Sequence, residues 1–131
     1  MADVLVDTSV WIEFFRKHEP CYGIVARLID EERVCCVGLI LAELMQGAKS
    51  EKELSVLGDF PHVFPFLPET PQLWEDAGRL SFAMRRKGLT IGLADCFIAK
   101  AAAAGRAQLA TLDSHFDALR KPAKITLFPL S

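Results

Sequence analysis

The sequence has no long hydrophobic run and no basic leader segment. Its longest apolar run, Val34 to Ala42, has nine residues, about half of the roughly 20 that a membrane-spanning helix requires. The chain opens with an acid, Asp3, and strand-like residues, where a secreted protein would carry basic residues and a longer apolar helix. We therefore expect no membrane span and a cytoplasmic location.

Cysteine and histidine patterns typical of zinc sites are absent as well. The four cysteines form no Cys-x-x-Cys pair, and the three histidines stand far apart along the chain. The cysteines are therefore expected to be reduced core residues. Because 15 basic and 17 acidic residues give a net charge of −2, the positive field of DNA-coating proteins is missing too, and any nucleic-acid contact must be local.

What the sequence does have is enough apolar content for one folded domain over residues 1–131, with 51% hydrophobic and 24% charged residues. Short apolar runs alternate with segments of helical period, which favours an α/β sandwich whose mainly parallel central sheet is covered on both faces. Strands are expected at 4–6, 34–37, 108–111 and 125–128. Helices are expected around 11–15, 24–29, 39–46, 51–60, 71–87, 93–104 and 116–119.

Four acidic residues fall where the expected strands and helices meet. Asp7 and Asp113 follow apolar strands. Glu43 belongs to the helix after the second strand, and Asp95 opens the helix before the third. Because ligands of open α/β sheets bind beyond the carboxyl ends of the strands, these acids are expected to face one another. Taken singly, each has a plainer interpretation as a helix cap, a partner of the helix dipole or a solvated side chain.

Converging carboxylates repel one another unless they take up protons or recruit a cation. An all-oxygen site suits Mg²⁺ or Mn²⁺ better than Zn²⁺, and one or two such ions would assist hydrolysis of a phosphodiester bond. A phosphatase with an aspartyl nucleophile is disfavoured, because Ser9 stands where haloacid-dehalogenase-like enzymes carry a second aspartate. The motifs of a response-regulator receiver are not found either.

Four segments, in order along the whole chain, resemble the acidic motifs of PIN-domain ribonucleases, and specifically of the VapC-type toxins of bacterial toxin-antitoxin pairs. The resemblance implies a PIN-like three-layer α/β/α sandwich and a metal-dependent endoribonuclease that hydrolyses RNA phosphodiester bonds. A non-catalytic PIN-like protein-interaction module is the alternative function. The four segments are Val4–Ile12, Leu41–Gly47, Gly92–Ala99 and Leu109–Phe116.

The same resemblance implies roles for individual residues. The cofactor would be Mg²⁺ or Mn²⁺, with the number of ions, one or two, left open. Asp117, beyond the fourth acid, is expected to be solvated. The catalytic, metal-binding acids would be Asp7, Glu43, Asp95 and Asp113, and the hydroxyls that orient a carboxylate, a water or a phosphate would be those of Ser9 and Thr111.

The resemblance also implies partners: an RNA substrate, commonly tRNA or ribosomal RNA, a second copy of the chain in a homodimer, and a cognate VapB-type antitoxin in a heteromeric complex. Such antitoxins lay a short tail over a groove of the toxin. Trp11, Phe14 and Phe15 would help to form that groove, although an aromatic stripe on a helix is also typical of a core.

Cations that could hold RNA phosphates cluster near the end of the longest expected helix. Lysine and arginine in this position also favour the helix dipole without any ligand. Leaving out the four proposed metal acids, 15 basic residues face 13 acidic ones, so the metal-loaded protein would be mildly positive. The candidates for RNA contact are Arg85, Arg86, Lys87 and Lys100, together with Arg79 and Arg106.

Overall fold

The fold is built on a short parallel sheet, which a computed structural model describes together with the rest of residues 1–131. The sheet has three strands in the order β2-β1-β3, with bounds β1 Val4–Val6, β2 Val34–Cys35 and β3 Gln108–Ala110. The central strand β1 is completely buried, as expected for an all-apolar strand covered on both faces. Val6 pairs with Ala110, and the amide of Asp7 donates to the Ala110 carbonyl at 2.9 Å. The residues that follow β1 and β3 are therefore neighbours.

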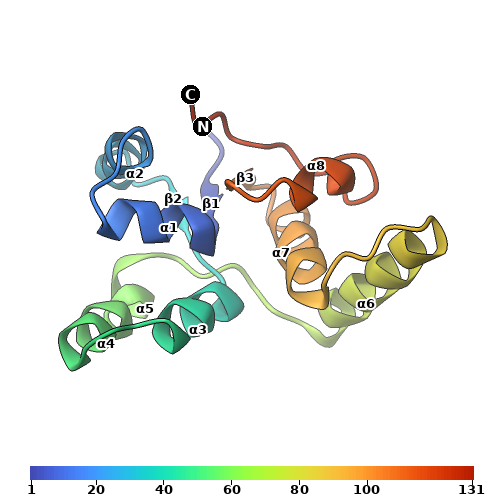
Figure 1. The fold of residues 1–131 in the computed structure, drawn as a ribbon, viewed down its shortest axis with the longest axis horizontal. Coiled ribbons are helices and arrows are strands. Elements are labelled where there is room, and N and C mark those ends of the chain that lie inside the picture. Colours follow the sequence, from blue (N-terminus) through green and yellow to red (C-terminus); the bar gives the residue numbers. More distant parts are fainter.

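Eight helices flank this sheet in two groups (Figure 1). Helices α1 to α5 lie on one side of the molecule and α6 to α8 on the other, and the two chain termini lie close together. The predicted α/β sandwich with a parallel sheet is confirmed. The bounds are α1 Thr8–Phe15, α2 Cys21–Asp30, α3 Gly38–Gln46, α4 Glu51–Gly58, α5 Phe60–Val63, α6 Pro71–Arg86, α7 Leu93–Ala104 and α8 His115–Leu119.

The pair α6 and α7 forms the most extensive helix packing. Thr70 caps the N-terminus of α6, since its side chain accepts a hydrogen bond from the amide of Leu73 at 3.1 Å. Pro71 occupies the first position of the helix. Four buried residues of α6, at helical spacing, face the alanine-rich helix α7, whose small side chains allow a close approach. This packing fixes α7, and with it Asp95 in the first turn of α7. The four buried α6 residues are Leu73, Ala77, Leu80 and Met84.

A single core of 34 buried hydrophobic residues includes all four cysteines, which are unpaired thiols. The prediction that they are reduced core residues is confirmed. Burial raises the pKa of the Cys35 thiol to about 12 and that of Cys36 to about 11. These thiols stay protonated at neutral pH, and protonated buried thiols are poor nucleophiles and poor metal ligands. No helix is both long enough and apolar enough to cross a membrane.

Two sequence predictions about secondary structure are wrong. Residues 125–128 form no strand: the segment touches β3 through a single bridge between Leu109 and Leu127. Pro129 cannot donate to a ladder and would end pairing there. The helix expected at 51–60 is two helices, which meet at Asp59. Pro61 does not end a helix but sits in the first turn of α5, where its missing amide hydrogen would have no partner anyway.

Candidate active site

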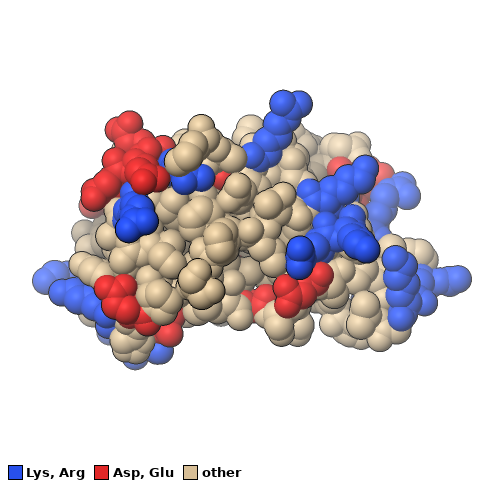
Figure 2. Space-filling view, turned by 90° about the horizontal axis from the view of Figure 1, so that it is seen from above, with Lys and Arg blue, Asp and Glu red and all other residues tan.

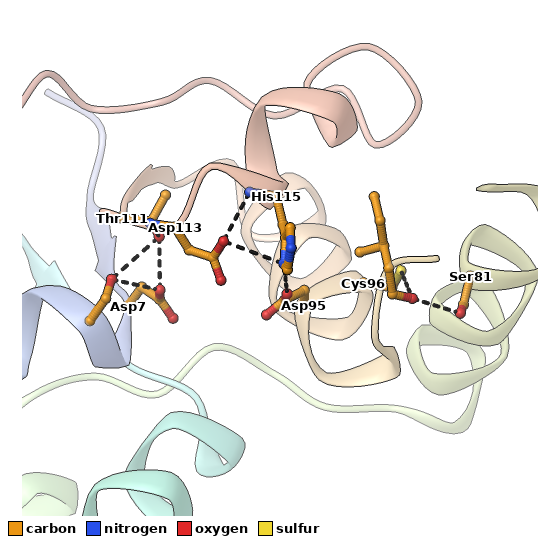
Figure 3. A network of polar contacts seen from close by, with 9 residues as sticks. Asp7, Ser81, Asp95, Cys96, Thr111, Asp113 and His115 are labelled. Atoms are coloured by element: carbon orange, nitrogen blue, oxygen red, sulfur yellow. Dashed lines mark hydrogen bonds and ion pairs between the residues drawn. The ribbon is translucent and has the colours of Figure 1, made fainter. Parts of the chain in front are cut away.

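The first acid, Asp7, directly follows β1 and is the one buried charged residue of the chain, with 6% of its surface exposed. One of its carboxylate oxygens, Oδ2, accepts two hydroxyl hydrogen bonds, from Thr111 Oγ1 at 2.8 Å and from Ser9 Oγ at 3.0 Å (Figure 3). The two hydroxyl residues singled out from the sequence therefore both contact Asp7. They satisfy a buried charge with hydrogen bonds, as burial of a carboxylate requires.

The same hydroxyls hold the loop after β3. The amide of Leu112 donates to Ser9 Oγ at 3.0 Å, and the amide of Asp113 donates to Thr111 Oγ1 at 3.0 Å. Each hydroxyl thus accepts from the loop backbone while it donates to Asp7. The start of α1 and the loop 111–113 are joined through these two side chains, and this places the carboxylate of Asp113 beside the end of β1.

Asp95 and Asp113 meet at the carboxyl end of the sheet, together with a residue that the sequence did not single out, His115. The Nδ1 atom of His115 lies 3.3 Å from Asp95 Oδ2 and 3.4 Å from Asp113 Oδ1 (Figure 3). One ligand atom from each of the three residues falls within 4.8 Å of the others. His115 has no histidine or cysteine partner at the spacing of a zinc site, so the sequence shows no metal-site pattern for it. Its position two residues after Asp113 was the only feature that could have pointed to this role.

Negative charges lie close together in this cluster, and they affect the pKa of Asp95. Burial raises the pKa of the Asp95 carboxyl, and the charges of Asp113 and Asp7 raise it further, while the hydrogen bond and charge of His115 oppose the shift. No lysine or arginine forms an ion pair with Asp7, Glu43, Asp95 or Asp113. The three aspartates therefore influence one another without a neutralising side-chain cation, apart from His115 when it is protonated.

Glu43 lies on α3, apart from this cluster. Its Oε1 accepts from the hydroxyl of Thr8 at 2.8 Å, and Thr8 is the neighbour of Asp7 at the start of α1. The structure thus ties Glu43 to the same corner of the fold but shows no contact with the other three acids. No local sequence pattern indicates this contact of Thr8, because its hydrogen-bond partner lies 35 positions away along the chain.

A hollow of about 380 Å³ opens between α1, α3 and α4, with Thr8 and Glu43 in its wall. Ile12 and Phe15 line it, whereas Trp11 is only 1% exposed and packs against Phe60 and Phe64. Of the three aromatic side chains expected to form a groove, only Phe15 lines this hollow. Trp11 and Phe14 belong to the aromatic packing beneath it, where the two rings meet edge to face.

The predicted RNA-contact cations do not form one group: Arg79 lies within α6 in an ion pair with Glu75 at 3.0 Å, and Arg106 follows the end of α7. Arg85, Arg86 and Lys87 end α6, and Lys87 lines a second hollow, of about 610 Å³, together with Arg120 and Lys121. Figure 2 shows lysines and arginines gathered over the same half of the molecule. Arg120 and Lys121 were not singled out, because they join Lys87 only in three dimensions. Lys100 lies on α7, half-buried, and does not line this hollow. Asp117 is exposed on α8 and lies outside the acidic cluster.

The donor set of the cluster fits a divalent cation. Carboxylate oxygens of Asp95 and Asp113 lie within 4.8 Å of each other, and Asp7 is near enough for its charge to raise the pKa of Asp95. None of the three forms an ion pair with arginine or lysine, and the cluster is partly open, with 24% of the Asp95 side chain and 35% of the Asp113 side chain exposed. Oxygen donors of this kind are those that Mg²⁺ and Mn²⁺ take in proteins. A cation placed among them would offset the repulsion from Asp113 and Asp7, which adds to the effect of burial in raising the pKa of Asp95.

Known proteins resemble this chain over almost its full length. A relative named VapC ribonuclease Mb1587, from Mycobacterium bovis, is 29% identical over 123 residues, 90% of this chain and 92% of the relative. Ribonuclease VapC11 of Mycobacterium tuberculosis has the same identity and coverage.

Solved structures give the same answer for the fold. The structure of VapBC2 from Rickettsia felis, bound to a DNA fragment from its promoter, superposes with a TM-score of 0.75 at 25% identity and covers 95% of this chain and 96% of that one. DNA-bound VapBC from Salmonella typhimurium gives a TM-score of 0.73 at 24% identity over 100% of both chains. The family model of the PIN domain matches residues 4–122. Since that match covers most of the chain, the protein belongs to the PIN-domain family.

Proposed function

We propose that this protein is a metal-dependent endoribonuclease and acts as the toxin of a toxin-antitoxin pair. The observation that carries the proposal is the meeting of Asp7, Asp95 and Asp113 at the carboxyl end of a parallel sheet, without a lysine or arginine to neutralise them. The family membership and the relatives named VapC ribonuclease agree with this chemistry. The proposed reaction is hydrolysis of RNA phosphodiester bonds.

In this proposal Asp7, Asp95 and Asp113 hold Mg²⁺ or Mn²⁺, with Glu43 at the edge of the site. When bound, such an ion lowers the pKa of a water and stabilises charge on the leaving oxygen. Ser9 and Thr111 orient Asp7 by binding its Oδ2, which leaves Oδ1 free to face the site. Glu43 likewise uses Oε1 to accept from Thr8, and its second oxygen is available to a water or to the substrate.

We also propose that a VapB-type antitoxin binds the hollow between α1, α3 and α4, in a heteromeric complex that contains a homodimer of this chain. The hollow has apolar walls, formed by Ile12, Phe15 and Val56. Each of these side chains is more than a third exposed. A peptide that fills the hollow would reach Glu43 in its wall. Glu43 is hydrogen-bonded to Thr8, which directly follows Asp7 in the sequence. The structural neighbours from Rickettsia felis and Salmonella typhimurium are VapBC complexes, which supports this choice of partner.

Incubation of the purified protein with total cellular RNA, followed by mapping of the new 5′ ends, tests the proposed function. We expect cleavage of tRNA or ribosomal RNA at defined positions with Mg²⁺ or Mn²⁺, loss of cleavage in EDTA, and recovery when the ion is added in excess. Cleavage that persists in EDTA would contradict the metal-dependent mechanism. Normal binding of the antitoxin with no cleavage of any RNA would favour the interaction module instead.

We further propose that Arg85, Arg86, Lys87 and Lys100 contact the RNA backbone, and that Arg120 and Lys121 extend the Lys87 hollow toward the same ligand. Changing Arg120 and Lys121 together to glutamine removes two charges from the hollow. We expect the slope of log K against log salt for single-stranded RNA to fall by about 1.4, because each phosphate contact adds roughly 0.7. Fluorescence anisotropy with labelled RNA in EDTA measures binding without cleavage.

A matched control removes the same charge elsewhere. Lys17 and Arg27 are exposed on the α1–α2 side of the molecule and line neither of the two hollows described above. Changing both to glutamine is expected to leave the salt slope unchanged. Equal slopes for the two double variants would mean that the hollow beside Lys87 does not hold RNA, since net charge alone would then explain any loss of affinity.

A further inference from the structure

His115 is the one nitrogen donor beside the acidic cluster. Its side chain is 60% exposed, yet Nδ1 does not point into solvent but lies between two carboxylates, 3.3 Å from Asp95 Oδ2 and 3.4 Å from Asp113 Oδ1. Figure 3 shows the imidazole ring directed at Asp95, with the carboxylate of Asp113 beside it. Both contacts therefore end on the same ring atom.

The local backbone fixes this arrangement. The amide of His115 donates to Asp113 Oδ1 at 2.9 Å, so Asp113 contacts both the backbone and the ring of His115. Asp95 comes from the first turn of α7, which is fixed by its packing against α6. The ring and the two carboxylates are thus brought together by separate parts of the fold, although the ring itself is largely exposed.

Hydrogen bonds from Nδ1 of His115 to both carboxylates do not account well for the Nδ1–oxygen distances of 3.3 and 3.4 Å. Charge-assisted N–H···O bonds are about 2.7–2.9 Å long, and one N–H group can point at only one of the two oxygens. Adjacent ligands of an octahedral cation with bonds of about 2.1 Å are separated by about 3 Å. The observed 3.3 and 3.4 Å exceed that spacing by only a few tenths of an ångström. Small side-chain movements would suffice to place the three atoms around one ion.

We propose that Nδ1 of His115 is a ligand of the divalent cation that Asp95 and Asp113 hold, and that this nitrogen makes the site prefer Mn²⁺ to Mg²⁺. Mg²⁺ is a hard cation that takes oxygen ligands, whereas imidazole is a better ligand for transition-metal ions. The proposal rests on the proposed function only in requiring that a divalent cation binds these carboxylates.

Pulsed electron paramagnetic resonance of the Mn²⁺-loaded protein tests the proposal directly, because an imidazole nitrogen bound to Mn²⁺ gives a ¹⁴N coupling. We expect this coupling in the wild-type protein and its loss in His115→Gln. Calorimetric titration with each metal alone is expected to show Mn²⁺ affinity lowered by at least about 10-fold in His115→Gln, because even the loss of a residue that only orients a metal ligand lowers affinity by about 10- to 100-fold. Mg²⁺ affinity is expected to change less than about 3-fold.

His18→Gln is the matched control. His18 is also an exposed histidine whose Nδ1 contacts a carboxylate, 3.0 Å from Glu13 Oε2, but it lies in the segment between α1 and α2, outside the cluster. This variant is expected to keep both the ¹⁴N coupling and the wild-type Mn²⁺ affinity. Circular dichroism of both variants checks that the fold is retained.

Two outcomes would overturn the proposal, and they differ in what else they affect. Mn²⁺ that binds with wild-type affinity in His115→Gln, or that shows no ¹⁴N coupling in the wild-type protein, would make His115 a hydrogen-bond partner only, and the metal-dependent nuclease would stand. Failure of the wild-type protein to bind either Mn²⁺ or Mg²⁺ would overturn both the histidine ligand and the proposed mechanism.

Discussion

The variant Asp95→Asn is expected to lose RNA cleavage by roughly 10³-fold while it folds at least as stably as the wild-type protein without metal. The loss of activity follows from removing one of three converging carboxylates. If the metal contributes several kcal/mol to the transition state, losing most of that contribution lowers the rate by about three orders of magnitude. Cleavage at saturating Mn²⁺ and thermal melts in EDTA measure the two effects separately.

The stability of this variant follows from the charge around Asp95. The pKa of its carboxyl is raised by burial first, and also by the charges of Asp113 and Asp7. Because the pKa is higher in the folded than in the unfolded chain, the stabilisation that Asp95 provides is fully present below its unfolded pKa, about 3.9, and is lost as the pH rises through the folded value. At neutral pH the ionised side chain therefore lowers the free energy of unfolding.

Asparagine removes that charge, so at pH 7 in EDTA we expect an unchanged melting temperature or a rise of up to about 3 °C. The rise is small because the variant also loses the favourable interaction of the carboxylate with the α7 dipole. The gain is expected to shrink as the pH is lowered toward 4. Asp30→Asn, an exposed position at the end of α2, should change neither activity nor stability. A large fall in melting temperature would instead identify Asp95 as a structural partner of the α7 N-terminus.

The sequence predicted the positions of Asp7, Asp95 and Asp113 correctly, because local patterns determine them. The apolar runs before Asp7 and Asp113 are short and rich in residues that favour buried strands, and Gly92 and Gly105 delimit the helix that carries Asp95. Parallel strands place their carboxyl ends at one edge of the sheet, so the meeting of these acids followed from topology. The roles of these residues in catalysis remain predictions.

What the sequence missed depends on contacts between distant segments. His115 has no partner at fixed spacing, and its neighbours at the site include Asp95, 20 positions earlier. Lys87 and Arg120 share a hollow only because α8 lies beside the end of α6. Residues 125–128 have the composition of a strand, but they pair with β3 through one bridge only. Composition reports the preference for extended backbone, whereas pairing depends on the neighbouring strand.

Thr111→Val is expected to lower both cleavage and Mn²⁺ affinity by about 10- to 100-fold, the range found when partners that orient metal ligands are removed. Thr111 donates to Asp7 Oδ2 at 2.8 Å and accepts from the amide of Asp113 at 3.0 Å, so its hydroxyl positions two of the proposed ligands at once. Valine has nearly the same shape but neither bond. Removing a hydrogen bond to a charged group also costs about 1.5–3 kcal/mol of stability.

Two further variants separate positioning from stability. Thr111→Ser keeps the hydroxyl and is expected to remain within about 3-fold of the wild-type Mn²⁺ affinity, because the bond to Asp7 is retained. Thr126→Val makes the same change at an exposed position and should have no effect. If Thr111→Val melts at a lower temperature but binds Mn²⁺ normally, Ser9 alone must orient Asp7, through its own bond of 3.0 Å to the same oxygen. The double variant Ser9→Ala with Thr111→Val would then lose the affinity that each single variant keeps.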